Sequence, residues 1–234
     1  MRLLVHVEGQ TEELFVNDVL APYLYARGFS SVSARLLGTA RFRANRGGIR
    51  SWAAVRNDIA RHLKNDNEAC ATTMVDYYAL PAGADGWPVR DEAICLAPEN
   101  RARHVENAIH SDFCNFMDDA FDNCRFVPYV TMHEFEALLF SDCSIFADCA
   151  GRPEVAITLA GIRSDYDTPE HINDSPETAP SKRVAEIIPE YQKVFIGALA
   201  AASIGVEAIV AECPGFGRWI DNLISLANPV PDKN

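Results

Sequence analysis

The chain opens with the segment MRLLVHVEGQTEE, residues 1–13, in which an apolar stretch ends at a glutamate followed by a glycine. The apolar residues within 3–7 predict a short buried strand. Gly9 is expected in a turn that suits glycine, and Thr11 is expected to cap the helix that follows. This pattern predicts Glu8 at the carboxyl end of a strand, the end at which α/β proteins place their ligand sites.

Predicted strands and helices alternate through the first half of the chain. After the opening strand, further strands are expected at 31–38, 69–78 and 124–132, and helices at 11–27 (kinked by Pro22), from about 48 through Leu63, and at 98–121. The order β-α-β-α-β-α-β favours an α/β fold with a mostly parallel four-stranded sheet flanked by helices. Residues 133–234 have a mainly helical pattern, so we expect an α/β core at 1–132 and a C-terminal helical lobe packed on it.

Composition limits the classes of function. The net charge of −12 over 234 residues argues against a passive nucleic-acid coat, although an enzyme that holds phosphate through a metal ion and a local basic patch is compatible with it. Seven cysteines without a Cys-x-x-Cys spacing fit neither a disulfide framework nor a zinc site. No segment resembles a signal peptide or approaches the ~20 apolar residues of a membrane span. We therefore expect a cytoplasmic protein without a membrane partner.

Acidic residues follow three of the predicted strands. Glu8 ends the first, Asp76 ends the third, and His133, Glu134 and Glu136 follow the fourth. The second strand leads into a loop rich in arginine and glycine, with Arg41, Arg43, Arg46, Gly47 and Gly48. Since the carboxyl ends of parallel strands meet at one edge, we expect these groups to converge there. Carboxylates for Mg²⁺ beside arginines for phosphate favour phosphoryl-transfer chemistry.

Each of these residues also has a structural interpretation. Glu8 could be a solvated turn residue, and Glu12 is explained by its place in a first helical turn, although it could also support a metal shell. With i, i+2 spacing on a helix, at most one of Glu134 and Glu136 is expected to face the metal. The arginines could belong to an ordinary solvated loop. Zinc-binding spacings, a serine nucleophile elbow, a Walker A loop and a GxGxxG fingerprint are absent from the sequence. Metal-assisted chemistry is therefore favoured over the classes of enzyme that these motifs mark.

Two of these strand ends carry a family resemblance. With VEGQTE at 7–12 and MVDYY at 74–78, the chain resembles the TOPRIM fold of topoisomerases, primases and overcoming-lysogenization-defect nucleases. It is most similar to the bacterial TOPRIM-like family of unknown function that includes the nuclease effector of the PARIS anti-phage defence system. HEFEALLF at 133–140, PEHINDSPETAPSKR at 169–183 and CPGFGRWI at 213–220 extend the resemblance over most of the chain.

The resemblance implies a Mg²⁺ (or Mn²⁺) nuclease site. Glu8 would act as metal ligand or general base, Asp76 would hold the metal, and Glu134 or Glu136 would replace the missing second acid of the Asp-x-Asp pattern, which here reads Asp-Tyr-Tyr. That missing acid puts a two-metal mechanism in question. The remaining implied residues are Lys182 and Arg183 for nucleic acid, and Glu12, Tyr78 and His133 as supporting groups.

Several functions stay open at this stage. The first is a metal-dependent nuclease that cuts DNA or RNA and works with an ATPase partner in anti-phage defence. The second is a non-catalytic TOPRIM-like module that binds nucleic acid or an ATPase, and the third is a phosphohydrolase of small nucleotides. The apolar stretch VFIGALAAASIGVEAIV at 194–210 suits a homodimer interface.

Overall fold

A five-segment parallel sheet forms the centre of the protein in the computed structural model, which describes residues 1–37, 49–83, 86–172 and 178–228. The order is β2-β1-β3-β4, with β5 also paired to β3, and every pairing is parallel. The expected α/β class with a mostly parallel sheet is confirmed. Its strands are β1 (Arg2–Val7), β2 (Ser31–Leu36), β3 (Ala69–Asp76), β4 (Phe126–Val127) and β5 (Val130–Thr131).

The predicted fourth strand is divided in two. Pro128 lies between β4 and β5, and proline cannot donate a ladder hydrogen bond. The strand still follows the edge of β3, because Phe126 pairs with Ala71 and Thr131 pairs with Asp76. The interruption leaves β5 in line with the carboxyl end of β3.

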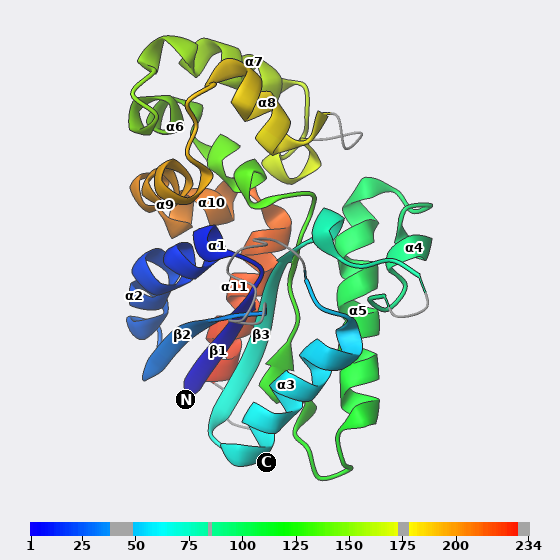
Figure 1. Cartoon of the computed structure of the whole chain (residues 1–234). Helices are drawn as coiled ribbons and strands as arrows, with labels where there is room; N and C mark the ends of the chain where they lie inside the picture. Colours follow the sequence, from blue (N-terminus) through cyan, green and yellow to red (C-terminus); the bar gives the residue numbers. More distant parts are fainter. Residues whose placement is uncertain (38–48, 84–85, 173–177, 229–234) are drawn as a thin grey trace.

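Helices cover both faces of the sheet (Figure 1). The first expected helix forms as α1, a π-helical segment η1 and α2, and α2 begins at Ala21, one residue before Pro22. The kink at Pro22 stays a prediction. The expected helix at 98–121 ends earlier, at Phe116. In this half the helical segments are α1 (Gln10–Phe15), η1 (Val16–Leu20), α2 (Ala21–Tyr25), α3 (Trp52–Asn65), η3 (Tyr77–Ala79), α4 (Arg90–Ala93), α5 (Pro98–Phe116) and η4 (Asn123–Arg125).

The second half of the chain is helical, as expected. Most of its helices lie beyond the carboxyl ends of the strands, at the top of Figure 1, whereas α11 returns along the sheet. The segments are η5 (Phe135–Ser141), α6 (Cys143–Cys149), η6 (Pro153–Val155), α7 (Ala156–Ser164), η7 (Pro169–His171), α8 (Pro180–Ile187), α9 (Lys193–Ile204), α10 (Val206–Glu212) and α11 (Pro214–Ala227).

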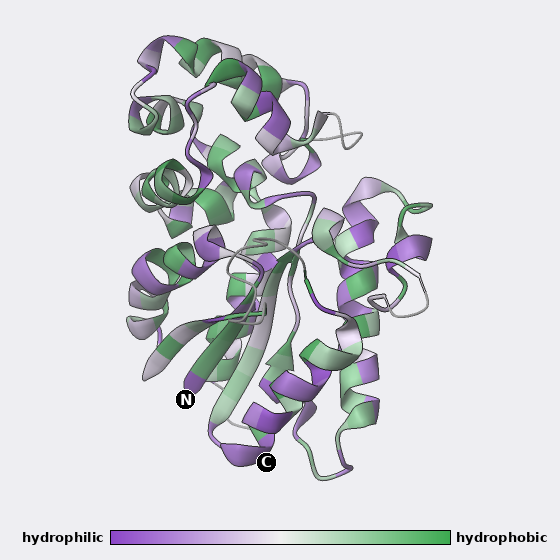
Figure 2. Ribbon diagram, in the orientation of Figure 1, coloured by the Kyte–Doolittle hydropathy of each residue, from purple (hydrophilic) through white to green (hydrophobic). Residues whose placement is uncertain are grey.

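The sheet has a hydrophobic core on each face. Leu3, Val5 and Val7 of β1 pack with α1, α2 and α11, while Ala71 and Val75 of β3 pack with α3 and α5 on the other face. Every residue of β3 is buried, as expected for a strand covered on both sides. Figure 2 shows the hydrophobic strands in the middle of the molecule.

Helix α11 ties the end of the chain to the sheet. The indole Nε1 of Trp219 donates to the Thr72 hydroxyl at 2.8 Å, and the Trp219 ring stacks on Tyr129 at 4.4 Å. One hydrophobic cluster therefore includes residues from both sides of position 132. The division into units at 1–132 and 133–234 stays a prediction.

No single helix in the described ranges is long and apolar enough to cross a membrane. Helices α9 and α10 meet the criteria of length and composition only as a pair, with a bend of 85° between them.

Candidate functional site

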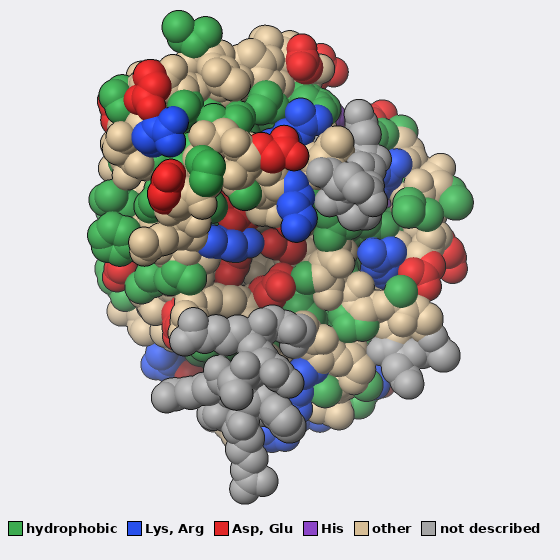
Figure 3. All heavy atoms as spheres, turned by 45° about the horizontal axis from the view of Figure 1, so that its top comes forward, with side chains coloured by type: hydrophobic (Ala, Val, Ile, Leu, Met, Phe, Trp, Pro, Cys, Tyr) green, Lys and Arg blue, Asp and Glu red, His purple; other side chains and the backbone are tan. Residues whose placement is uncertain are grey.

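The parallel register brings the predicted acids to one rim of the sheet. Val7 pairs with Met74, so Glu8 follows β1 beside the end of β3, where Asp76 is the last residue. Asp76 pairs in turn with Thr131, two residues before His133. Seen from this side, acidic side chains gather in a hollow that Lys and Arg side chains border (Figure 3).

Glu8 lies in a partly buried position with one unsatisfied oxygen. Its Oε2 atom has no hydrogen-bond partner in the described part of the chain. Burial raises the pKa of Glu8 from 4.5 to about 7, and the charge of Glu12 contributes to the increase. Lys193 and the backbone of Asp76 act in the opposite direction. Folding thus makes the charged form of Glu8 costly.

The turn after β1 differs from the sequence prediction. Gly9 has an extended backbone with φ of −139°, which any residue adopts, and it is itself the N-cap of α1 in place of Thr11. The Glu12 carboxylate turns back and accepts the Gly9 N–H at 3.0 Å. A Cβ on Gly9 would lie 3.0 Å from that same carboxylate oxygen. Close approach of Glu12, and not a special φ, therefore favours glycine here.

Asp76 is the more deeply buried acid of the pair. Its residue surface is 5% exposed, and its Oδ1 has no hydrogen-bond partner within the described ranges. Burial raises the pKa of Asp76 well above its usual value, and the nearby Glu12 and Glu8 raise it further. The ends of β1 and β3 therefore bring together two carboxyl groups whose charged forms are disfavoured, at the positions that the sequence predicted.

The charges of Glu134 and Glu136 raise the pKa values of this pair. Glu134 precedes η5 in an extended conformation, and its Oε2 accepts the N–H of Ser181 at 2.9 Å. Glu136 is fully buried, and burial raises the pKa of its carboxyl. The charge of Glu134 reaches Glu8, and that of Glu136 reaches Asp76. We expected only one of them to face the cluster because we assumed the spacing of an α-helix. In the structure Glu134 is extended and Glu136 lies in a 3₁₀-helix, so that spacing does not apply.

Lys193 is the residue that the sequence analysis missed. Its Nζ donates to Glu136 Oε2 at 3.0 Å, and its side chain is 43% exposed. Burial acts to lower the pKa of Lys193, but the carboxylates of Glu136, Asp76 and Glu12 outweigh that effect and raise it. The available signal was a lysine at the first position of an apolar helix, where the helix dipole disfavours a cation.

His133 joins the rim in an unusual conformation. Its φ of 68° is left-handed, which is rare for a residue other than glycine, and it is 1% exposed. Neither ring nitrogen has a partner in the described residues, and the ring packs on Tyr78 at 5.1 Å. Burial lowers the pKa of His133 to about 4, with Arg101 and His171 adding to the effect, so its imidazole is neutral at pH 7. Strain of this kind often marks a functional position.

The predicted basic residues have different outcomes. Arg41, Arg43, Arg46, Gly47 and Gly48 lie outside the described residues. Lys182 is exposed on α8. Arg183 makes hydrogen bonds within the protein: it donates to the Thr178 carbonyl and to the Tyr166 hydroxyl, both at 2.9 Å. Arg183 is therefore a structural residue of the α7–α8 region.

The donor set fits a hard cation with few protein ligands. No three His, Cys, Asp or Glu side chains of the described ranges are arranged as a ready-made metal site. Mg²⁺ needs only one or two carboxylates, since it retains several water ligands. Glu8 and Asp76 each have a buried oxygen without a partner in the described ranges, and burial together with the neighbouring acids raises the pKa of both carboxyl groups. The residues present thus fit Mg²⁺ or Mn²⁺ held by this pair.

The fold and this rim define an α/β protein with a carboxylate cluster at the carboxyl ends of its parallel strands. The chain belongs to the family described as a domain of unknown function, DUF4276, whose sequence profile matches residues 7–224. No curated protein and no solved structure matches it.

Proposed function

We propose that this chain is a Mg²⁺- or Mn²⁺-dependent nuclease that hydrolyses phosphodiester bonds of DNA or RNA at the carboxylate rim. The observation that carries the proposal is the Glu8–Asp76 pair at neighbouring strand ends, in which each carboxyl group has one buried oxygen without a hydrogen-bond partner in the described residues. A buried anion is costly unless a cation pairs with it. Lys193 supplies one positive charge to four carboxylates, those of Glu136, Asp76, Glu12 and Glu8. A divalent cation would complete the balance.

The residues of the rim have complementary abilities. Glu8 has a pKa of about 7, which suits a base that accepts a proton from water near neutral pH. Lys193 is placed to stabilise negative charge that develops on a phosphate. A bound metal ion would polarise the phosphate and lower the pKa of a coordinated water. Whether Glu8 acts as ligand or as base, its role requires the carboxylate charge.

The TOPRIM resemblance supports this proposal through the strand ends that carry Glu8 and Asp76. It also motivates the wider proposal that the protein is an anti-phage effector working with an ATPase partner. The absence of a second acid after Asp76 favours a single-metal site, because Tyr77 and Tyr78 occupy the following positions. Tyr77 instead donates its hydroxyl to the Arg90 carbonyl at 2.9 Å.

The test is cleavage of labelled single- and double-stranded DNA and RNA with Mg²⁺ or Mn²⁺, with the ATPase encoded beside this gene supplied if there is one. Glu8→Gln and Asp76→Asn should each lower the rate at least ~100-fold, in line with loss of a general base or metal ligand. Glu13→Gln is the matched control, because Glu13 lies beside Glu12 in the first turn of α1 but is not buried with it. Equal cleavage by wild type and Glu8→Gln would rule out the catalytic assignment.

A second candidate is a non-catalytic module that docks a protein partner, an ATPase or a second copy of the chain. It is favoured by apolar side chains exposed close to the rim: Phe195 is 67% exposed and Leu199 43% exposed on α9, and Leu14 of α1 is 36% exposed. If wild type cleaves no substrate with either metal, this candidate replaces the nuclease.

A further inference from the structure

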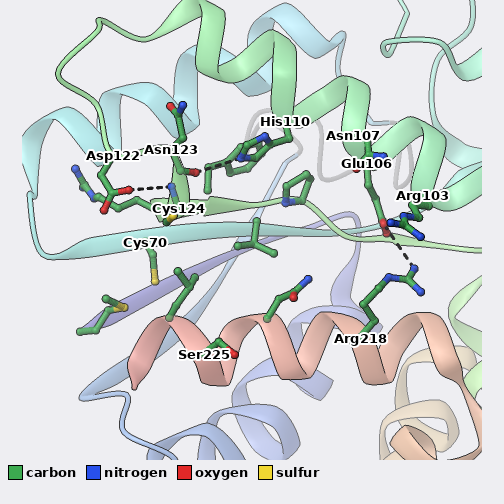
Figure 4. A pocket seen from close by; sticks show the side chains of 17 residues that line it. Cys70, Arg103, Glu106, Asn107, His110, Asp122, Asn123, Cys124, Arg218 and Ser225 are labelled. Carbon is green, nitrogen blue, oxygen red and sulfur yellow. Dashed lines mark hydrogen bonds and ion pairs between the residues drawn. The ribbon is translucent and has the colours of Figure 1, made fainter. Parts of the chain in front are cut away.

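A groove lies along the edge of the sheet, away from the carboxylate rim (Figure 4). Its floor is the segment 122–128, which includes β4, and its walls are α5 from one face of the sheet and α11 from the other. The cavity measures about 810 Å³. Its charged side chains are Arg103, Arg125, Arg218, Glu106 and Asp122, and His110 and Asn222 also line it.

A second cavity adjoins the groove. A smaller cavity of about 220 Å³ shares Glu106 and Arg218 with it and extends to Met132. Met132 directly precedes His133 and Glu134 of the rim. The lining of the smaller cavity also includes Glu99, Glu170 and His171.

The groove is more basic than the protein as a whole. Arg103 and Arg218 are exposed at its walls, and the Arg218 side chain is 44% exposed in a chain with net charge −12. Glu106 is the nearest acid, but its closest approach to Arg218 is 3.9 Å and its side chain is 13% exposed. Burial raises the pKa of Glu106 to about 7, so it neutralises the arginines incompletely near neutral pH. Clustered arginines of this kind bind anions.

The edge itself is unsuited to pairing with an added peptide strand. Pro128 has no N–H, and the Val130 N–H is already bonded to Glu106 Oε1 at 3.0 Å. Arg125 donates to the backbone carbonyls of Ala69, Leu63 and Asp66, which fixes the start of β4. A short edge with proline is a feature that prevents strand addition. Side chains, and not the backbone, are therefore the recognition groups of this groove.

We propose that the groove holds single-stranded nucleic acid, with Arg103 and Arg218 as its phosphate contacts. This inference rests on the proposed function and extends it, because it assigns a path for the part of the substrate beyond the cleavage site. Arg103 and His110 lie two helical turns apart on α5, about 10 Å along the helix, so the wall offers contacts over more than one nucleotide. The amides of Asn107 and Asn222 are available for sugar or base contacts.

The experiment compares binding of a labelled single-stranded 20-mer and a labelled dinucleotide by fluorescence anisotropy over a range of salt concentrations. All proteins carry Glu8→Gln, so that the probe is not cleaved. Arg103→Glu together with Arg218→Glu should weaken binding of the 20-mer at least tenfold, and that of the dinucleotide less. The slope of log affinity against log salt should fall by about 1.4, since each phosphate contact contributes about 0.7. Arg61→Glu is the control, because Arg61 is 63% exposed on α3 outside the groove.

Three outcomes would overturn the inference. The first is a loss of affinity no greater than that of Arg61→Glu, and the second is an equal loss for the dinucleotide and the 20-mer. The third is displacement of the 20-mer by poly-glutamate at the same charge concentration, which would indicate an acidic protein partner. The milder pair Arg103→Gln and Arg218→Gln, checked by thermal unfolding, separates charge from misfolding. Metal-dependent cleavage by the protein with Glu8 intact tests the nuclease proposal separately, so either idea can fail alone.

Discussion

Removal of the Glu8 charge should stabilise the metal-free protein at neutral pH. The pKa of Glu8 rises from 4.5 to about 7 on folding, so the folded state holds the proton more tightly than the unfolded state. The free energy of unfolding therefore falls as pH increases through this interval, and above it the ionised carboxylate costs about 3 kcal/mol. Glu8→Gln keeps the shape of the side chain and removes that cost.

We expect a gain of about 2–3 kcal/mol for Glu8→Gln at pH 8, or roughly 5–10 °C in Tm for a chain of this size. At pH 4.5 the two proteins should have similar stability, since the wild-type carboxyl is then largely protonated in the folded state. Urea unfolding in the presence of a chelator at pH 4.5, 6 and 8 measures the difference. Glu13→Gln should change stability by less than about 0.5 kcal/mol throughout.

Metal ions should largely cancel this difference in stability, because they stabilise wild type more than Glu8→Gln. Mg²⁺ at about 100 times its dissociation constant would stabilise wild type by about 2.7 kcal/mol, and Glu8→Gln should lose most of that gain. If Glu8→Gln destabilises the protein equally at pH 4.5 and pH 8, the carboxylate is not under electrostatic strain. The reasoning from burial and from the neighbouring Glu12 would then be wrong.

Further substitutions test contacts of the rim, the helices and the sheet. Lys193→Met should cost about 3 kcal/mol at pH 8, because it leaves a buried carboxylate without its cation, and urea unfolding should show a smaller cost at pH 5. Gly197→Ala should destabilise the protein by about 1–3 kcal/mol in thermal unfolding, since its Cβ would lie 2.9 Å from the Tyr191 hydroxyl. Gly161→Ala has open space around it and should stabilise the protein by about 0.5–1 kcal/mol in the same measurement. Trp219→Phe should cost about 1–3 kcal/mol by loss of its buried hydrogen bond, and a double-mutant cycle with Thr72→Val should recover a coupling energy of about 1 kcal/mol.

Periodicity in the sequence was sufficient to predict the alternation of strands and helices and a mostly parallel sheet. Strands covered on both faces are continuously apolar, and β3 is recognisable for that reason. Because parallel strands share one direction, the residues at their ends could be assigned to one rim before any contact was known. That argument alone placed Glu8 beside Asp76, and it also located Glu134 and Glu136 near them.

The sequence by itself therefore determined the fold class and the acids at the strand ends, since both follow from local patterns along the chain. Only the tertiary structure decided which basic side chain pairs with those acids. Lys193 lies 57 residues after Glu136, and nothing in local spacing relates the two. The same holds for the groove, where Glu106 and Arg218 approach each other from α5 and α11, helices on opposite faces of the sheet. Such contacts depend on how helices pack in three dimensions, and hydrophobic packing sets that arrangement without a signature in adjacent residues.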